Sequence, residues 1–94
     1  MQLEAVVNAK QLKVWQSVID RDGGMCLDCG AVASEVHHIA SRARPWAWCP
    51  ENMLCLCKAC HDQAHTHSAR VRHLRLLEER YGCEHDDRWQ EWSV

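Results

Sequence analysis

The sequence has few of the residues that usually build a hydrophobic core. Its 94 residues contain no Phe and one Tyr, and the hydrophobic share of 47% includes seven Cys and five Trp. A chain of this length forms one small domain, which buries only about 60–65% of its unfolded surface. So thin an aliphatic core needs additional cross-links. We therefore expect the cysteines to stabilise the fold, either as disulfides or as ligands of a metal ion.

The chain also lacks a long apolar run and a leader-like start. No stretch of about 18 apolar residues is present, so we expect no membrane span and no membrane partner. The first four residues offer neither a basic nor an apolar region, and we expect no secretory signal. An intracellular, cytoplasmic location follows, where thiols stay reduced and bind zinc rather than pair. Seven cysteines also cannot all pair within one chain.

A net positive charge is absent as well, since the formal charge is −2. This value at first argues against a nucleic-acid partner. The distribution is uneven, however, because residues 36–75 hold six basic and two acidic side chains together with six of the seven His. A basic face on an acidic protein is compatible with binding a polyanion. On charge alone, a solvated charged surface explains the pattern nearly as well.

Apolar periodicity and turn residues predict a small α+β fold without repeats or linkers. The first half is expected to form a helix over residues 3–21 stopped by Asp22-Gly23-Gly24, a knuckle over 25–30, a strand over 35–39 and a loop over 40–50. The second half is expected to form a strand over 53–56, a knuckle from Cys57 that leads into a helix carrying His61 and His65, and a helix over 68–81 ended by Gly82. The acidic tail over 83–94, with Trp89 and Trp92, has no predicted place.

Two thiol pairs have the spacing of zinc ligands. Cys26 and Cys29 form the first pair, and Cys57 and Cys60 form the second. Two intervening residues let both sulfurs of a pair reach one ion at about 2.3 Å, and two pairs complete a tetrahedral four-cysteine site. The 27 residues between the pairs exceed the spacing of an ordinary zinc ribbon, so a further element lies between them. The alternative is a chance coincidence of two CxxC matches in a Cys-rich chain.

Histidines and one asparagine surround these pairs in the order H-H-x13-N-x8-H-x3-H. His37 and His38 are adjacent on a strand and point to opposite faces, so one can bind a metal while the other addresses substrate. His61 and His65, at i and i+4 of a helix, can hold one ion. A three-histidine site leaves positions open for water or a phosphate oxygen, and a neutral imidazole beside it suits a general base. Asn52 is expected to clamp the loop or the base.

Three cysteines and three histidines lie outside these two sets. Cys55 competes with Cys57 as a zinc ligand, although its spacing is the poorer match. We expect all three spare cysteines to be small buried hydrophobic residues, namely Cys49, Cys55 and Cys83. We expect no function for the three spare histidines, namely His67, His73 and His85.

These residues together resemble the HNH endonuclease family, whose catalytic module is the ββα-metal finger. The resemblance spans about residues 15–67 and is carried by Cys26, Cys29, His37-His38-Ile39, Asn52, Leu56-Cys57, Cys60-His61 and His65. Residues 21–30 are also similar to the opening segment of zinc-containing phage and bacterial HNH proteins. The resemblance implies one HNH nuclease domain over 1–94: an N-terminal helix over 1–24, a zinc-stapled ββα-metal core over 25–67, and a C-terminal helix and acidic tail over 68–94.

The resemblance also implies a role for each motif residue. His37 stands where the family has a metal-binding Asp or His, and His38 stands at the general-base position. Asn52 is the middle residue, which orients the loop and the base. His61 is the final metal-binding histidine, and His65 matches an extra ligand of the nuclease colicins and some phage enzymes.

Substrate contacts are expected in the loop that follows the first two histidines. Unlike the usual family loop, this one has no Gly and a late Pro. Arg42 and Arg44 are candidates for clamping a phosphate. Glu35 resembles a position that helps to order the phosphate site in the nuclease colicins. Trp46 and Trp48 either stack on an unpaired base or, in the reading we favour, cap a core without Phe.

The function implied by the resemblance is metal-dependent hydrolysis of DNA phosphodiester bonds. Beside the structural Zn²⁺, a catalytic Mg²⁺, Mn²⁺, Ni²⁺ or Zn²⁺ would stabilise the transition state while the base activates water. DNA contacts are expected mainly at the backbone. Free-standing HNH proteins of this size resemble those that phages use in genome packaging, which implies a bacterial or phage origin and a packaging or other protein partner.

Two other functions compete with a nuclease. A zinc-finger module that binds nucleic acid or protein could carry an inactive nuclease site. A metal-storage or metal-sensing protein would also use many Cys and His, but would bind more ions and have no affinity for nucleic acid.

Overall fold

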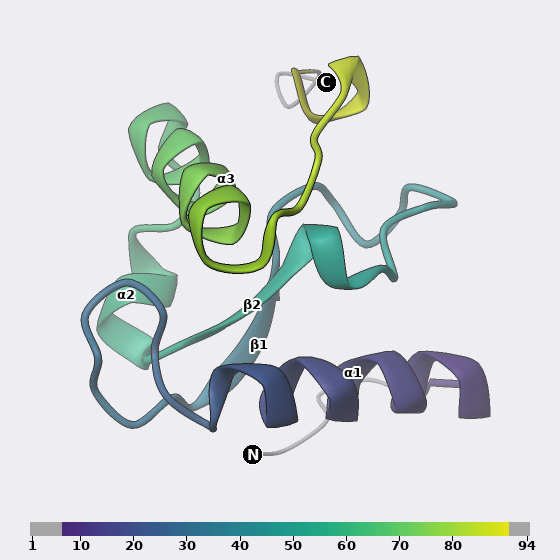
Figure 1. Cartoon of the computed structure of the whole chain (residues 1–94), viewed down its shortest axis with the longest axis horizontal. Helices are drawn as coiled ribbons and strands as arrows, with labels where there is room; N and C mark the ends of the chain where they lie inside the picture. Colours follow the sequence, from purple (N-terminus) through teal and green to yellow (C-terminus); the bar gives the residue numbers. More distant parts are fainter. Residues whose placement is uncertain (1–6, 91–94) are drawn as a thin grey trace.

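The structure is a computed structural model that describes residues 7–90. Within this range the chain forms a small α+β fold of three α-helices, two short 3-10 turns and one two-stranded hairpin. The hairpin lies between α1 on one side and α3 on the other (Figure 1). This agrees with the predicted fold class at the level of its elements.

Helix α1 (Ala9–Asp22) begins later than predicted. Asn8 accepts a hydrogen bond from the Gln11 backbone, and the Gln11 side chain accepts one from the Asn8 backbone, which makes a capping box. This cap leaves residues 7 and 8 outside the helix, and residues 3–6 of the prediction lie outside the described range. The predicted stop is confirmed, because Gly23 takes the left-handed conformation with φ of 65°.

The two predicted strands form one antiparallel hairpin. Strand β1 (Glu35–His38) pairs with β2 (Met53–Leu56), and the register places His37 opposite Leu54 and His38 opposite Met53. Ile39 lies just beyond the paired strand, although residue 39 was predicted to belong to it. Since side chains alternate along a strand, the two histidines face different layers of the molecule.

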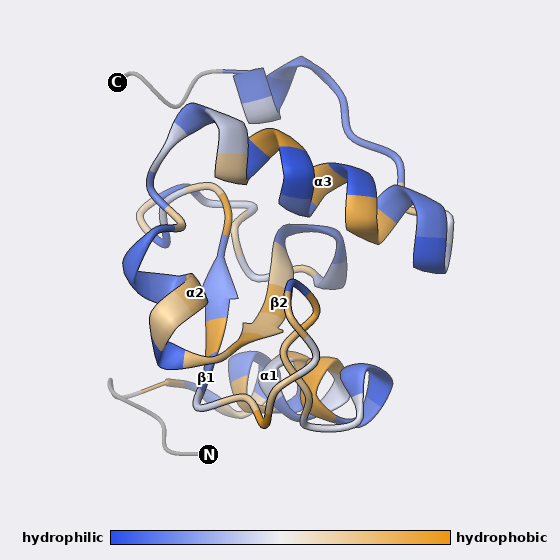
Figure 2. Ribbon diagram, turned by 90° about the vertical axis from the view of Figure 1, so that its left-hand side faces the viewer, coloured by the Kyte–Doolittle hydropathy of each residue, from blue (hydrophilic) through white to orange (hydrophobic). Residues whose placement is uncertain are grey.

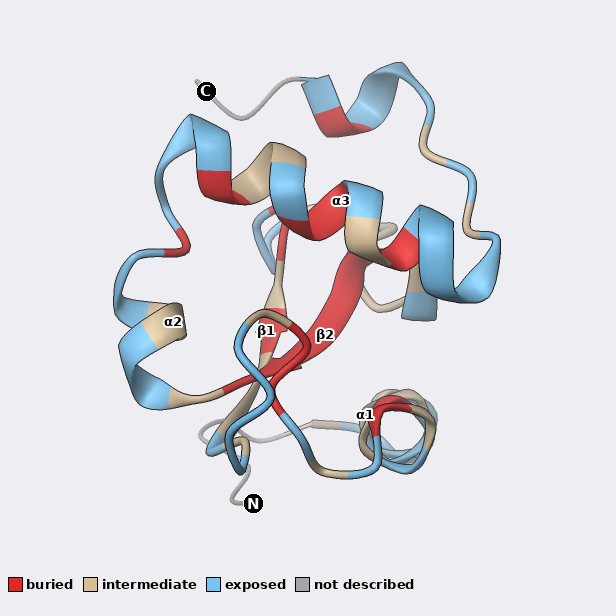
Figure 3. Cartoon of the chain, turned by 60° about the vertical axis from the view of Figure 1, so that its left-hand side comes forward, coloured by how far each residue is buried: buried red, intermediate tan, exposed pale blue. Residues whose placement is uncertain are grey.

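Strand β2 is the centre of two thin apolar clusters. Leu54 and Leu56 pack toward Leu77 of α3, whereas Met53 and Cys55 pack toward Val18 of α1. Strand β2 is therefore buried along its whole length (Figure 3). It is hydrophobic throughout, whereas its partner β1 is largely hydrophilic (Figure 2). The cluster on the α3 side contains ten buried residues, whereas the cluster on the α1 side contains three.

The histidines His61 and His65 do not share a helix, which corrects the prediction. Helix α2 (Lys58–Asp62) ends before residue 65, and α3 (His67–Tyr81) starts immediately after the Thr66 cap. The Thr66 hydroxyl accepts a hydrogen bond from the backbone of the new helix at 3.2 Å. This cap favours a new start over continuation of α2, so the chain turns at residues 63–66.

The C-terminal segment returns to the core. Gly82 ends α3 with φ of 68°, as predicted. The 3-10 turns are η1 (Pro50–Asn52), before β2, and η2 (Asp87–Gln90), in the tail. Trp89 of η2 is 1% exposed, which places part of the tail in the core, while residue 92 lies outside the described range. None of the described helices is long and apolar enough to cross a membrane.

Candidate functional site

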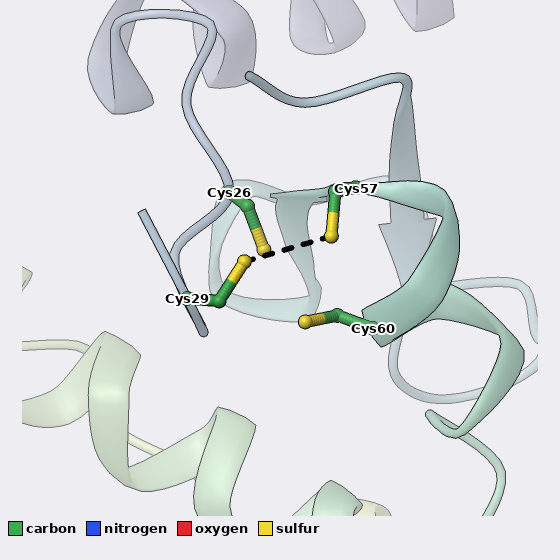
Figure 4. A group of neighbouring side chains, drawn as sticks. All are labelled: Cys26, Cys29, Cys57 and Cys60. Atoms are coloured by element: carbon green, nitrogen blue, oxygen red, sulfur yellow. Dashed lines mark hydrogen bonds between the residues drawn. The ribbon is translucent and has the colours of Figure 1, made fainter. Parts of the chain in front are cut away.

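The four predicted zinc ligands come together from two segments (Figure 4). Cys26 and Cys29 sit in the knuckle, where the Gly30 N–H donates to the Cys26 carbonyl at 2.9 Å. Cys57 is the N-cap of α2, and Cys60 follows in its first turn. Each pair therefore lies in a tight turn: the first pair in the knuckle, and the second pair at the start of α2.

The geometry of this four-cysteine cluster fits a tetrahedral metal ion. All four sulfurs lie within 4.8 Å of one another, and the Cys29 and Cys57 sulfurs are 3.6 Å apart. Sulfurs at about 2.3 Å from a tetrahedral Zn²⁺ would be about 3.8 Å apart. The donor set of four thiols also matches a structural zinc site. The cluster is therefore consistent with the predicted structural zinc.

The spare cysteines are excluded from this cluster. Cys55 is fully buried against α1, where its sulfur lies 3.9 Å from the Val18 carbonyl, so it does not compete with Cys57. The expectation of a small buried hydrophobic residue is confirmed for Cys55. Cys49 and Cys83 are only half-buried at the edge of the Leu54 cluster, so for them the expectation is met in part.

Hydrogen-bond donors at the knuckle lower the pKa values of Cys26 and Asp28 and so favour their charged forms. Burial acts to raise the pKa of Cys26, but N–H groups of Cys57, Cys29 and Asp28 outweigh it and lower that pKa to about 7. The Arg72 guanidinium hydrogen-bonds Asp28 at 2.8 and 2.9 Å and holds the pKa of that carboxyl at about 2. An ionised Asp28 and a cationic Arg72 thus lie beside the cysteine cluster.

A second site, which we call the histidine pocket, opens beside the hairpin. Its volume is about 210 Å³, and it is lined by Glu35, Val36, His37, His38, Arg42, His61 and His65. It brings together all four predicted catalytic-site histidines and one of the two candidate arginines. Arg44 is half-buried and does not line the pocket.

The three predicted metal-binding histidines are neighbours. The His37 ring centroid lies 5.0 Å from that of His61 and 6.2 Å from that of His65. The His61 Nδ1 is 3.0 Å from Glu35, which is the carboxylate contact that commonly orients a metal-binding imidazole. The ring nitrogens are nevertheless more dispersed than the sulfurs, because among residues 7–90 only the four cysteines bring three or more ligand atoms within 4.8 Å. A shared ion requires these rings to turn toward one another.

His38 faces the other side of the hairpin, as the alternation of strand residues predicts. Its ring contacts Trp48 edge-on at 4.5 Å, and the Arg42 guanidinium lies 5.4 Å from the centre of a Trp48 ring. The His38 Nε2 is buried and has no hydrogen-bond partner in the described residues. Burial and, secondarily, Arg42 lower the pKa of His38 to about 4.

Burial lowers the pKa of His37 to about 3, and the charges of His61, His73 and His65 act in the same direction. His37 is therefore uncharged at neutral pH, as is His38. The uncharged imidazole is the form that binds a metal ion or accepts a proton.

Asn52 clamps the loop rather than lining the pocket. Its Oδ1 accepts hydrogen bonds from the Ala40 backbone and the Trp89 indole, each at 2.8 Å. Its Nδ2 donates to the carbonyls of Ala40 and Ala47 at 3.1 and 3.0 Å. The side chain is fully buried and saturated by these contacts. Of the two predicted roles, the structure shows the contacts of a loop clamp and none to His38.

The two loop tryptophans have different surroundings. Trp46 lies 4.7 Å from Trp89, and the Arg88 guanidinium lies 4.9 Å from the Trp46 ring and 5.0 Å from the Trp89 ring. This is the core-capping arrangement. Trp48 also caps the core, because it packs against the apolar cluster on the α1 side of β2, and in addition it contacts His38, which lines the histidine pocket. Only Trp48 is placed near the candidate site.

His73 is a site neighbour that the sequence analysis missed. It is fully buried, its Nε2 lies 3.1 Å from Asp28, and its ring centroid lies 6.3 Å from that of His37. Burial lowers the pKa of His73 against the opposing effect of Asp28. Its position on the inner face of α3 could be expected from its spacing of four residues from both Ala69 and Leu77, but the sequence carries no sign of the contact with residue 28.

No family model and no curated protein matches this chain. Its interpretation therefore depends on the sequence motif and on the structure described above. The similarity to HNH proteins therefore rests on the motif residues. The structure itself shows the α+β fold, the four-cysteine cluster and the histidine pocket.

Proposed function

We propose that this protein is a metal-dependent endonuclease of the HNH type, which hydrolyses phosphodiester bonds in DNA. The supporting observation is the histidine pocket, in which the four motif histidines and Arg42 meet. They are contributed by β1, the loop after it, α2 and the turn after α2. On this proposal residues 25–67 are the ββα-metal finger, and the cysteine cluster holds its two ends together.

The residues that would hold the divalent ion are His37, His61 and His65. Glu35 would orient His61 through its Nδ1 and leave Nε2 for the ion. When bound, the ion would neutralise charge on the phosphate and on the leaving oxygen. Imidazole nitrogens are better ligands for Ni²⁺ and Zn²⁺ than for Mg²⁺, which prefers oxygen ligands. We therefore expect Ni²⁺ and Zn²⁺ to support activity best.

His38 is the proposed general base, and Arg42 the proposed phosphate contact. An uncharged His38 can take a proton from the attacking water. Arg42 lines the same pocket and offers a guanidinium, which can donate two hydrogen bonds to one phosphate. The Asn52 clamp fixes the ends of the loop that carries Arg42, so it is a positioning residue.

The experiment that tests this proposal is nicking of supercoiled plasmid by the zinc-loaded protein. We expect no nicking in EDTA and nicking after addition of Mg²⁺, Mn²⁺, Ni²⁺ or Zn²⁺ in separate reactions. His38→Ala should lower the rate by a factor of about 100 or more, because a general base contributes about 10²–10⁴-fold. The matched control is His67→Ala, an exposed histidine outside the pocket. If the His38→Ala variant nicks plasmid at the wild-type rate, His38 is not the general base.

One observation favours the alternative of a binding module with an inactive nuclease site. The nitrogens of the histidine trio are less converged than the cysteine sulfurs. This function predicts DNA binding with no cleavage under any of the four ions. The metal-storage alternative predicts several tightly bound ions per chain and no DNA affinity, which metal analysis and a binding assay distinguish.

A further inference from the structure

His73 occupies the space between the two candidate metal sites. It comes from α3 and is fully buried, yet it touches the zinc knuckle through Asp28, whose Oδ2 lies 3.1 Å from the His73 Nε2. Asp28 itself stands between two of the clustered cysteines and is held by two hydrogen bonds from Arg72. The Asp28 carboxylate is therefore a fixed acceptor with a defined position against the His73 ring.

This contact selects the tautomer of His73. The Arg72-bound carboxylate accepts, so the His73 Nε2 must carry the proton and donate. In the neutral ring the Nδ1 is then an acceptor. That atom is buried and has no hydrogen-bond partner in the described residues. A buried polar atom without a partner is uncommon, and it indicates a contact that completes the site.

The nearest candidate partner is His37. Its ring centroid is 6.3 Å from that of His73, with the ring planes at 73°. His37 also faces the α3 side of the hairpin, since it stands opposite Leu54 in the register. His61 has its carboxylate partner in Glu35, whereas the ring of His37 is surrounded by the rings of three other histidines, one of them His73. A metal-binding imidazole normally donates its second N–H to such an acceptor.

We propose that His73 is a positioning residue of the histidine pocket, whose Nδ1 accepts a hydrogen bond from the His37 ring through a bridging water. The chain of contacts from Arg72 through Asp28 and His73 would then orient His37 for metal binding. This inference rests on the proposed function to the extent that His37 is a metal ligand. It would also join the zinc knuckle to the histidine pocket through α3.

Two substitutions separate the two nitrogens of His73. In His73→Gln the amide reaches the position of Nε2, so the contact with Asp28 is kept while the acceptor toward His37 is lost. In His73→Asn the amide lies at the position of Nδ1, so the acceptor is kept while the contact with Asp28 is lost. The control is His67→Gln, at the exposed start of the same helix.

The readout is the affinity of the zinc-loaded protein for Ni²⁺, measured by isothermal titration calorimetry, together with thermal unfolding. We expect His73→Gln to weaken Ni²⁺ binding by a factor of about 10–100, the usual effect of losing an outer hydrogen bond to a ligand. His73→Asn should bind Ni²⁺ nearly as tightly as the wild type but unfold at a lower temperature. If His73→Gln and His73→Asn bind Ni²⁺ with equal affinity, His73 has only a structural role and the inference is overturned.

His37→Ala distinguishes this inference from the proposed function. If His37→Ala binds Ni²⁺ as the wild type does, the proposed metal site itself is wrong. If His37→Ala loses Ni²⁺ but His73→Gln does not, only the role of His73 is refuted. Should a His73 variant fail to fold, nitrogen NMR shifts of the wild-type imidazoles decide: a proton on the His73 Nδ1 would overturn the inference.

Discussion

At the scale of single residues, Asn52 is a polar side chain that the protein holds in its core, outside the cysteine cluster and the histidine pocket. It is fully buried, and its amide makes four hydrogen bonds to Ala40, Ala47 and Trp89. A loop of irregular backbone has few other ways to satisfy its polar groups inside the protein. The Asn52 amide therefore supplies hydrogen bonds to the irregular loop between β1 and β2 that the loop backbone does not make with itself.

Asn52→Asp should destabilise the protein although the two side chains have nearly the same shape. The carboxylate loses both donors, leaves two buried carbonyls without a partner and brings a charge into the core. We expect the free energy of unfolding to fall by about 3 kcal/mol or more. Urea unfolding followed by tryptophan fluorescence measures this change. Asn8→Asp is the matched control, because Asp caps α1 as well as Asn does; equal effects of both variants would contradict the clamp.

Residue types and spacing were enough to predict the cysteine cluster, because each CxxC turn is local and the tetrahedral ion needs four thiols. The pocket histidines also come together, although the shared helix predicted for His61 and His65 was wrong. His73 and Trp89 could not be found in this way. Their contacts reach Asp28 and Asn52 across 45 and 37 positions of the chain, and no short pattern encodes such pairs.

At the scale of elements, the end of α1 is joined to β2 and α3 by one buried carboxylate. Asp22 accepts from the Cys55 backbone at 2.9 Å and from the Tyr81 hydroxyl at 2.7 Å, and it pairs with Arg21 at 2.8 Å. Arg21 in turn donates to the Met53 carbonyl at 2.7 Å. The helix is thus fastened to its neighbours by polar contacts as well as by its apolar face.

We expect Asp22→Asn to lower the free energy of unfolding by about 2 kcal/mol, because hydrogen bonds to a charged acceptor contribute about 1.5–3 kcal/mol each. The variant keeps one acceptor and loses the ion pair with Arg21. Asp20→Asn, two residues earlier on the exposed side of α1, is the control and should change stability by less than about 0.5 kcal/mol. Thermal unfolding by circular dichroism compares the two; a similar small shift in both would show that Asp22 does not join the elements.

Element types were predictable where local chemistry is strong. Glycine stops ended α1 and α3 as predicted, and alternation identified both strands. The first boundary of α1 and the extension of α2 to His65 were wrong because caps decided them, whereas the separate helix predicted over 68–81 is found as α3. Asn8 and Thr66 are side chains whose hydrogen bonds to nearby N–H groups outweigh the apolar periodicity around them.

At the scale of the whole molecule, the apolar core is divided between the two sides of β2, and we expect stability to depend on the cysteine cluster as well. Binding of a structural zinc ion contributes directly to folding free energy. Cys57→Ser should therefore lose the ion and unfold. Cys83→Ser, a half-buried cysteine outside the cluster, should keep one zinc per chain and remain folded.

Circular dichroism and metal analysis of the purified variants test this dependence. Removal of the ion from the wild type with a strong chelator should reproduce the unfolding of Cys57→Ser. A well-folded Cys57→Ser protein without zinc would show that the two apolar clusters suffice.

The connection between the strands has a consequence for the order of folding. β1 and β2 are joined by residues 39–52, so no tight turn can start the hairpin. Both strands lie between the two cysteine pairs, and an ion bound to those pairs closes the loop that contains them. Closing that loop in advance removes part of the entropy cost of bringing the strands together. We therefore expect refolding to become faster as free zinc rises, with the metal acting as the nucleus that a hairpin turn supplies elsewhere.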